Sequence, residues 1–485
     1  MQKRIHSVKY NFVMNFILTA SQFLFPLVTF PYVSRVLQAS GNGKISFATS
    51  VANYFLMIAS LGIPTYGVRA CAKVRDDIKQ LSKTAQEIFI INFVMTMFVS
   101  ITYILCIITI PRLHRDALLF YINGINIVLN MFGMNWLFQA LEQYDYITFR
   151  SLLFKIISLL LMFLLVHKEN DYIIYGAIIV FAATGSNILN FARAIRIIDF
   201  KIQGQYDLKR HFKPIFVLFA QSLAVSIYTN LDTVMLGFMK GDKAVGYYNA
   251  AVKIKTILVS LVTSLGNVLL PRMSYYAKKG LKRNFIDMMQ KSLNFTLLMS
   301  ISLSVYFVLF AQESILFLAG EGYSGAIRAM QIITIAVIPN GLTAVLGIQV
   351  LTAIEKEKCV LYSVIVGASV DLVLNIMLIP KYGAAGAALA TTIAEFSVLI
   401  VQCAYTKNYL REIRKGIRIK LYIFASVIGI LCVNFWEFEK IKSSFLSLCL
   451  SAITYFGVYA IVLLIGKEEL VVEVYNNIKK IFCRK

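Results

Sequence analysis

Stretches of about 20 consecutive apolar residues recur along the whole chain, and they constrain its fold more than any other feature. Only helices and closed barrels satisfy their backbone hydrogen bonds inside a bilayer, and a helix needs about 20 residues to cross it. Hydrophobic residues make up 58% of the 485 positions and charged residues 15%, which lies outside the usual range of soluble proteins. We predict an all-α polytopic membrane protein with about fourteen transmembrane helices, in the ranges 10–37, 44–62, 86–110, 117–140, 150–166, 173–192, 214–238, 247–270, 292–310, 327–352, 360–379, 384–404, 420–434 and 444–465.

The net charge of +23 has a topological explanation. Most of the 48 Lys and Arg residues fall in alternate loops, as the positive-inside rule requires. This distribution predicts that both termini are cytoplasmic, and it removes the need for a nucleic-acid partner. The basic runs at 278–283 and 411–420 follow from the same rule and from attraction to anionic lipid headgroups, so we assign them no chemistry.

Two long basic links, around 193–213 and 405–420, divide the predicted helices into groups of six, six and two. We therefore predict an N-lobe at 1–206, a C-lobe at 207–410, and a terminal helix pair with a cytoplasmic tail at 411–485. The two lobes share a faint repeat, since GKISFA at 43–48 occupies the same place in the first as GYYNAA at 246–251 in the second. Transporters built from such repeats hold their substrate between the halves.

Catalytic and metal chemistry is not expected. The seven cysteines form no C-x-x-C motif, and the four histidines are scattered without a Cys or carboxylate cluster at ligand spacing. We expect no metal, no cofactor and no disulfide framework. Every loop is short and there is no P-loop. A membrane-embedded polysaccharide polymerase or glycosyltransferase stays an alternative, although such enzymes generally need a sizeable outward loop.

Five motifs spread over nearly the whole chain resemble one family. They are TFPYVSRVL at 29–37, LGI at 61–63 with Tyr66, Gly67 and Arg69, NWLFQALE at 135–142, LDTVMLG at 231–237 and IPKYGAAGAA at 379–388. The chain is identified by them as a member of the polysaccharide transport group in the multidrug/oligosaccharidyl-lipid/polysaccharide exporter superfamily. It departs from the family pattern at Gln38, where the family usually has glycine. The turn at this position is therefore the one place where the geometry can differ from the family's.

The resemblance implies a transporter, not an enzyme. Members typified by O-antigen and capsule repeat-unit flippases move undecaprenyl-diphosphate-linked oligosaccharides from the cytoplasmic to the outer leaflet of the bacterial cytoplasmic (inner) membrane. Besides membrane lipids, the resemblance implies two candidate partner proteins, a polysaccharide polymerase and a chain-length regulator. A drug or cation exporter of the same superfamily is the first alternative, because one fold can carry either function.

Ionisable residues inside a membrane span mark paths for polar substrates. Arg35 and Lys253 lie about 9 Å from the predicted outer boundary, counted at 1.5 Å per residue. A polar stripe runs along the eighth span and comprises Asn249, Lys253, Thr256, Ser260, Ser264 and Asn267. Lys and Arg suit a diphosphate, so Arg35 and Lys253 are our leading substrate-binding candidates. Lys255 points elsewhere on the helix and ranks lower, as a snorkelling residue or a partner for a neighbouring helix.

Neutral polar residues are candidates for contact with the sugars. On the seventh span, Gln221 and Tyr228 share a face with Asp232, and on the fourth, Asn126 and Asn130 share one face while Trp136 lies roughly opposite. Helix packing is the competing explanation, since Asn, Gln, Ser and Thr often make hydrogen bonds between membrane helices.

A second set of residues could couple transport to an ion. It contains Asp232, Asp371, Asn375, Thr391 and Glu395. Hard oxygen ligands suit Na⁺, and a buried carboxylate can alternatively take up a proton. Glu395 has no partner that the sequence identifies, and Asp232 could instead form an ion pair with Lys253. Na⁺ or H⁺ is therefore the expected coupling ion.

Overall fold

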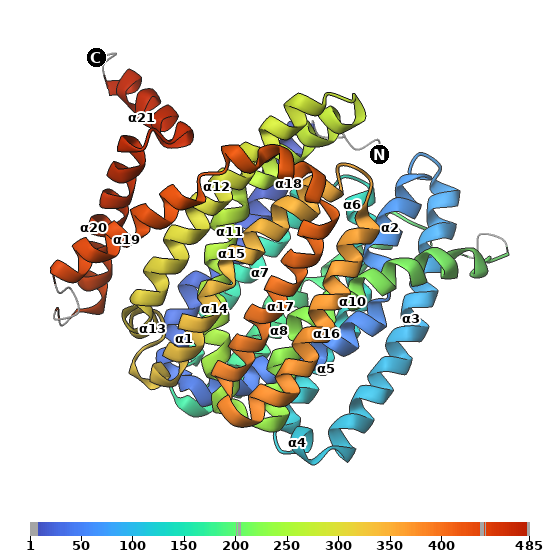
Figure 1. Ribbon diagram of the computed structural model, residues 1–485. Coiled ribbons are helices and arrows are strands. Elements are labelled where there is room, and N and C mark those ends of the chain that lie inside the picture. The colour runs from blue at the N-terminus through green and yellow to red at the C-terminus, as the bar shows by residue number, and fades with distance from the viewer. Residues whose placement is uncertain (1–7, 200, 202–204, 437–440, 442, 483–485) are drawn as a thin grey trace. The chain divides into compact units, whose positions relative to one another are not determined.

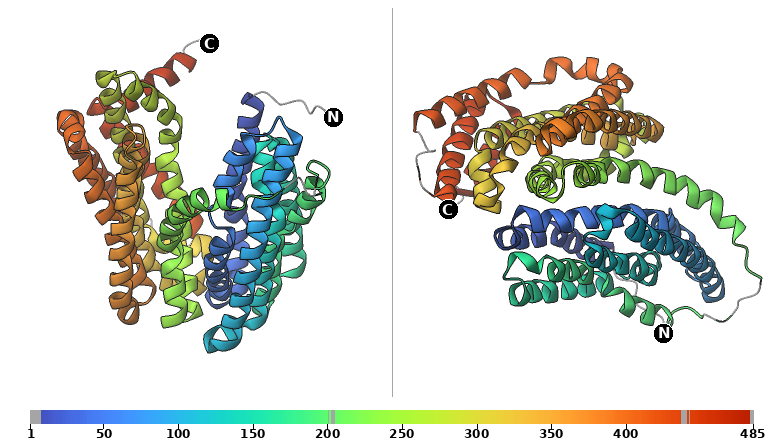
Figure 2. Two further views of the ribbon diagram at one scale, coloured as in Figure 1. Left: turned by 90° about the vertical axis from the view of Figure 1, so that its right-hand side faces the viewer. Right: turned by 90° about the horizontal axis from the view of Figure 1, so that it is seen from below.

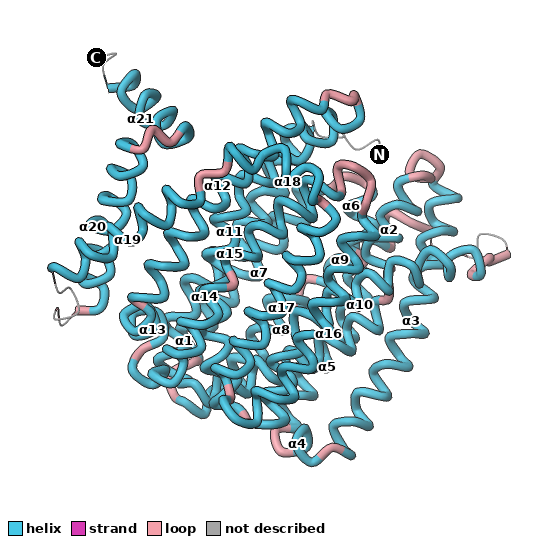
Figure 3. The backbone as a smooth tube through the Cα atoms, in the orientation of Figure 1, coloured by secondary structure: helices cyan, strands magenta, loops and turns pink. Residues whose placement is uncertain are grey.

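The computed structural model describes residues 8–199, 201, 205–436, 441 and 443–482. These residues form helices joined by short loops, with no strand among them (Figures 1 and 3). Ten helical segments of the described chain are long and apolar enough to cross a membrane, or up to 12 if each bent pair counts as one span. The prediction of an all-α polytopic membrane protein is confirmed. The count of fourteen is consistent with the helices, and all fourteen predicted ranges fall on them.

The chain divides into two compact units, residues 1–246 and 247–485. Within unit 1, the helices run side by side as a bundle (Figure 2), and α1 packs against α3, α5, α7, α8 and α10. The predicted lobe boundaries at 206/207 and 410/411 stay a prediction. The elements of unit 1 are α1 (Val8–Ser60), α2 (Ile63–Ala72), α3 (Ile78–Thr109), α4 (Pro111–His114), α5 (Ala117–Gly133), α6 (Asn135–Ala140), α7 (Tyr144–Leu165), η1 (Glu169–Asp171), α8 (Tyr172–Thr184), α9 (Asn187–Ala194) and α10 (Lys209–Met239), and α11 (Asp242–Lys278) begins there.

Unit 2 holds the rest of α11 and the remaining helices. Its most extensive helix packing is between α16 and α17 and between α19 and α20, and η3 is a π-helix inside a span. Its elements are α12 (Lys282–Leu309), α13 (Ala311–Ala319), η2 (Glu321–Ala326), α14 (Ile327–Ile335), α15 (Val337–Thr343), η3 (Ala344–Leu351), α16 (Glu357–Tyr382), α17 (Ala384–Tyr405), α18 (Lys407–Ile413), η4 (Arg414–Gly416), α19 (Ile419–Phe435), α20 (Ser444–Ile465) and α21 (Glu469–Phe482).

Helix α1 contains the first two predicted spans, and Gln38 is the break between them. Its φ of 56° and ψ of −177° fall in a region that essentially only glycine enters without strain. The family's usual glycine at this position therefore has a backbone explanation. The glutamine side chain offsets part of the strain, because its Nε2 atom donates a hydrogen bond of 2.6 Å to the Arg35 carbonyl.

Substitutions at Gln38 should separate the backbone strain from the side-chain hydrogen bond. Gln38→Gly loses the hydrogen bond but relieves the strain, so its stability should equal or exceed that of the parent. Gln38→Ala keeps the strain and should cost about 1 kcal/mol, and the β-branched Gln38→Val about 2 kcal/mol. Thermal unfolding in detergent measures the order. A glycine variant less stable than the alanine variant would contradict this account.

Candidate functional site

Arg35 lies in unit 1 on the half of α1 that precedes the break, and its side chain is exposed. Its Nη1 atom donates a hydrogen bond of 2.6 Å to the Pro31 carbonyl, one helical turn back. Pro31 itself has no N–H to donate to the preceding turn. This bond holds one terminal nitrogen of the exposed guanidinium against the backbone, one turn before the break at Gln38.

The polar stripe of α11 lies in unit 2, except that the Asn267 side chain is outside the described residues. Lys253 and Asn249 are half-buried on it. The hydroxyl groups of Thr256, Ser260 and Ser264 donate to carbonyls of α11 itself, at 2.8, 2.7 and 2.7 Å. These three residues therefore satisfy their hydroxyl donors within their own helix and do not need a neighbouring helix for it.

Lys255 forms an ion pair with Glu395 of α17, at 3.7 Å between Nζ and Oε1. Both side chains are largely buried, with 15% and 6% exposed. Lys255 therefore pairs with a residue of a neighbouring helix, which was one of the two roles expected for it. Lys255 is also the partner of Glu395 that the sequence did not identify. Four residues toward the start of α17, the Thr391 hydroxyl lies 3.0 Å from that of Tyr248 on α11, so two polar contacts join these helices.

The other coupling candidates are buried in both units. Asp371 and Asn375 lie one turn apart on α16, with 1% and 0% of their surface exposed, and Asp232 is buried on α10. Asp371, Asn375, Thr391 and Glu395 belong to unit 2, whereas Asp232 belongs to unit 1. Helices α16 and α17 pack against each other, and Gly383, with a φ of 57°, makes the turn between them. Within the described chain, no three His, Cys, Asp or Glu residues gather as a metal site.

Several of the sugar-contact candidates take part in packing. The Asn130 side chain donates a hydrogen bond of 3.0 Å to Ser60 on α1, and Asn126 is half-buried. Trp136 is buried, and a Cβ atom at Gly67 would come within 2.7 Å of its indole ring, so this pair requires the glycine. The side chains of Gln221 and Tyr228 lie outside the described residues.

A charged cluster that the sequence reading did not single out lies in unit 1, at the predicted outer side. We call Lys44, Arg112, Asp116 and Asp242 the outer clamp. Asp116 accepts from Lys44 at 2.9 Å and lies 3.5 Å from the Arg112 guanidinium. Arg112 also pairs with Asp242, and it donates to the Gly237 carbonyl at 3.0 Å. The clamp joins α1 and α4 to the end of α10 and the start of α11.

Two glycines let the backbones approach closely beside the outer clamp. A Cβ atom at Gly43 would collide with the Asp242 carbonyl, and a Cβ atom at Gly246 would collide with the Ala39 carbonyl. These are the first residues of the two faint repeats. The repeat was thus the available signal, but it could not reveal that Gly43 and Gly246 lie close together.

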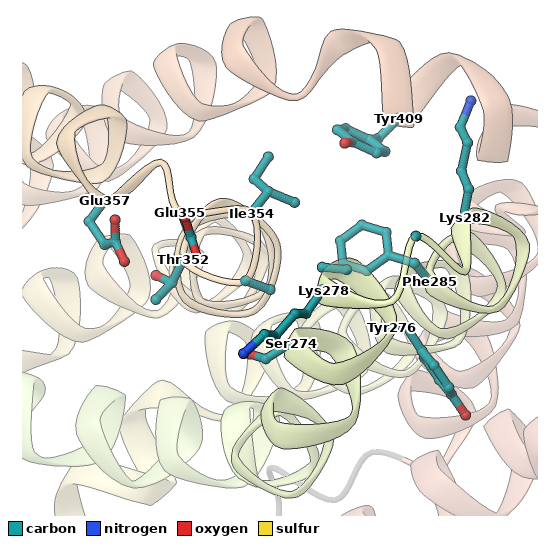
Figure 4. A pocket seen from close by; sticks show the side chains of 13 residues that line it. Ser274, Tyr276, Lys278, Lys282, Phe285, Thr352, Ile354, Glu355, Glu357 and Tyr409 are labelled. Atoms are coloured by element: carbon teal, nitrogen blue, oxygen red, sulfur yellow. The ribbon is translucent and has the colours of Figure 1, made fainter.

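A cavity of about 650 Å³ lies in unit 2 among the ends of α11, α12, α16 and α18. Figure 4 shows Lys278 beside Ser274, with Glu355 and Glu357 on one side of the cavity and Lys282 on another. Lys282 forms an ion pair of 2.6 Å with Glu412 of α18. Lys278 and Lys282 of the basic run therefore line a cavity that contains both signs of charge, and this mixture favours no single class of ligand.

Comparisons with known proteins agree with the fold and with the motifs. The chain is 24% identical over 408 residues to a candidate O-antigen transporter of Escherichia coli (strain K12), which covers 83% of this chain and 97% of that protein. It is 28% identical over 255 residues to an uncharacterized membrane protein of Methanocaldococcus jannaschii, covering 52% of this chain and 50% of that one.

Solved structures share the fold. The lipid II flippase MurJ, in its inward closed conformation, superposes with a TM-score of 0.75 over 95% of this chain and 100% of that one, at 16% identity. An inward-facing multidrug resistance MATE family transporter superposes with a TM-score of 0.59, covering 83% of this chain and 99% of that one, at 11% identity. These proteins are named as a flippase and a transporter, not as enzymes.

Two family models match overlapping ranges of the sequence. A MatE model matches residues 218–377. The model of the polysaccharide biosynthesis protein family matches residues 8–277, which is more than half of the chain and includes the motifs around Arg35, Asn135 and Asp232. This chain therefore belongs to the polysaccharide biosynthesis protein family, as the motifs predicted.

Proposed function

We propose that this protein is a flippase that moves undecaprenyl-diphosphate-linked oligosaccharides from the cytoplasmic to the outer leaflet of a bacterial inner membrane. The observation that supports it most is the stripe on α11, where Lys253 is followed by hydroxyl groups that donate to carbonyls of their own helix. A cation on a polar stripe at membrane depth suits a passing phosphate. The similarity to an O-antigen transporter agrees with this substrate class.

The proposed division of labour follows from side-chain chemistry. Arg35 and Lys253 engage the diphosphate, while Asn249, Asn126, Asn130, Gln221 and Tyr228 contact the sugars. Lys255 and Trp136 support these residues through their ion pair and their packing. Asp371, Asn375 and Thr391 bind the coupling ion, Na⁺ or H⁺, with Asp232 and Glu395 as further candidates. The polyprenyl tail stays in lipid.

Alternating access gives the outer clamp a role. Its ion pairs and glycine contacts hold the predicted outer ends of α1, α4 and α11 together. A carrier that releases its substrate into the outer leaflet must separate these ends. The pairs lie at the edge of the protein, and Arg112 and Asp242 are 19% and 12% exposed. Both charges can therefore regain water when the ends separate, which lowers the cost of breaking the pair.

The outer clamp can be tested by cysteine accessibility. Ala39 is buried beneath the Gly246 backbone, so Ala39→Cys should react slowly with an impermeant maleimide from outside. Adding Asp242→Asn removes the charge that pairs with Arg112, about 1.5 kcal/mol of closing energy, and should raise the labelling rate about tenfold. Glu169→Gln removes an exposed acid from the same side as the control. Equal rates in the Asp242→Asn and Glu169→Gln backgrounds would exclude a gating role.

Reconstitution tests the function itself. The protein is placed in liposomes that contain a lipid-linked oligosaccharide, and an impermeant glycan-cleaving enzyme reports how much substrate becomes accessible. Translocation raises this fraction above the fixed leaflet fraction of protein-free liposomes. No increase with several glycans, under imposed Na⁺, proton and potential gradients, would reject the proposal. Both termini should be cytoplasmic, and a polymerase and chain-length regulator are the expected downstream partners.

Export of drugs or organic cations is the second candidate function. The MatE match at residues 218–377 and the superposition on a multidrug transporter favour it. Ligand charge separates the two functions, because a cationic drug prefers an acidic path whereas a diphosphate prefers Arg35 and Lys253. Transport of cationic dyes that survives Lys253→Gln would support this second function.

A further inference from the structure

A helix break in unit 1 is surrounded by asparagine side chains. Helix α5 ends at Gly133 and α6 begins at Asn135, because Met134 between them takes a left-handed conformation with a φ of 42°. The break releases carbonyl groups that a continuous helix would satisfy. Asn187 donates to the Leu129 carbonyl at 3.1 Å, and Asn190 donates to the Gly133 carbonyl at 2.5 Å.

Arg150 of α7 reaches this break, and it is 6% exposed. Its Nη2 atom donates a hydrogen bond of 3.0 Å to Asn135 Oδ1, which also accepts from Asn190. The Nε and Nη1 atoms are buried and have no hydrogen-bond partner in the part of the chain that the structure describes. These two atoms carry three of the five N–H groups of the guanidinium.

The charge of Arg150 is not balanced by a carboxylate. No Asp or Glu oxygen of the described chain lies within 4.0 Å of its nitrogens, since every recorded ion pair involves other residues. The Tyr146 ring lies 5.7 Å from its guanidinium, and the Arg193 guanidinium lies 3.7 Å from that same ring. A second cation therefore shares the aromatic ring that the described residues place near Arg150.

A buried charge needs an opposite charge and a full set of hydrogen bonds. From this cluster we propose that Arg150 is the centre of a binding site for a small inorganic anion of the halide type in unit 1. A halide accepts several N–H groups at once and matches the single charge of the guanidinium. The small exposed fraction of Arg150 excludes a sugar phosphate or a lipid headgroup unless the helices part.

Asn190 adds one detail to the site. Its Oδ1 atom is fully buried and also has no hydrogen-bond partner within the described residues. An acceptor cannot bind a halide, but a water molecule beside the ion can donate to both. Water alone would satisfy the N–H groups of Arg150 and leave its charge uncompensated, so the proposed occupant is an ion with a water, not water by itself.

Halide-dependent stability tests the site without any transport assay. Thermal unfolding of the detergent-solubilised protein is measured as gluconate is replaced by chloride at constant ionic strength. A ligand that binds only the folded state raises the unfolding temperature with its concentration, here by about 3 °C. Arg150→Gln should lose this dependence and should be at least as stable as the parent in gluconate. Arg150→Lys should retain a weaker dependence.

Lys155→Gln is the matched control, because Lys155 lies on the same helix and its ammonium group already donates to Ser21 at 2.8 Å. It should keep the full chloride effect. Anomalous scattering from crystals of the parent grown in bromide gives a direct readout that needs no variant. A bromide peak beside the Arg150 guanidinium supports the site. The absence of such a peak, or a chloride effect that persists in Arg150→Gln, would overturn the proposal.

Discussion

Replacing Lys253 with glutamine is expected to slow translocation of a lipid-linked oligosaccharide by about 10- to 100-fold while the protein stays folded. The estimate follows from the 1.5–3 kcal/mol that a hydrogen bond to a charged group typically contributes. Glutamine keeps much of the side-chain length and polarity but removes the charge that would meet the diphosphate. The half-burial of Lys253 makes this interaction stronger than it would be in bulk water.

The measurement is the initial rate of glycan accessibility in liposomes, at equal protein content and with unfolding temperature as the check on folding. Lys253→Arg keeps the charge and should retain most of the rate. Lys243→Gln removes a positive charge from the exposed first turn of the same helix and serves as the matched control. Normal rates in both Lys253→Gln and Arg35→Gln would remove the proposed phosphate path.

The fold was predictable because its signals are local. Apolar runs of span length follow from the bilayer thickness, and alternate basic loops follow from membrane topology. The two spans at 10–37 and 44–62 placed a turn between them, at a position where the family usually has glycine, and the structure shows a φ of 56° at Gln38 there. Each of these features can be recognised from a short stretch of sequence.

Pairings between distant residues were much harder to predict. Helical geometry placed Lys255 away from the stripe, but it could not identify Glu395, 140 positions later, as its partner. The same holds for the pairing of Arg112 with Asp242 in the outer clamp, 130 positions apart. Residue type alone also could not separate packing from contact with a substrate, as the Asn130 hydrogen bond to Ser60 illustrates.

Arg150 shows a different limit. By sequence it lies at the predicted cytoplasmic end of a span, where the positive-inside rule already explains an arginine. Its distinguishing property is that it is 6% exposed and bonds a neutral asparagine at a helix break. Burial and partner identity are tertiary facts, so a charge that looked topological in the sequence is a candidate site in the structure.

Breaking the ion pair of Lys255 and Glu395 on one side should destabilise unit 2 by about 3 kcal/mol, because the remaining charge is left buried without a partner. Lys255→Met and Glu395→Gln should each show this loss as a lower unfolding temperature. The double variant removes both charges and should recover most of the stability, since a buried ion pair is often replaceable by uncharged residues. The coupling energy of the double-mutant cycle measures the pair directly.

The same cycle separates a structural role for Glu395 from a role in ion coupling. If the carboxylate only neutralises Lys255, the double variant should transport at close to the parent rate and keep its dependence on the ion gradient. If Glu395 carries the coupling proton, the double variant should be stable but should lose that dependence, because glutamine cannot titrate. Additive losses of stability in the two single variants would show that the 3.7 Å contact carries no net interaction, and Glu395 would then lose its structural explanation.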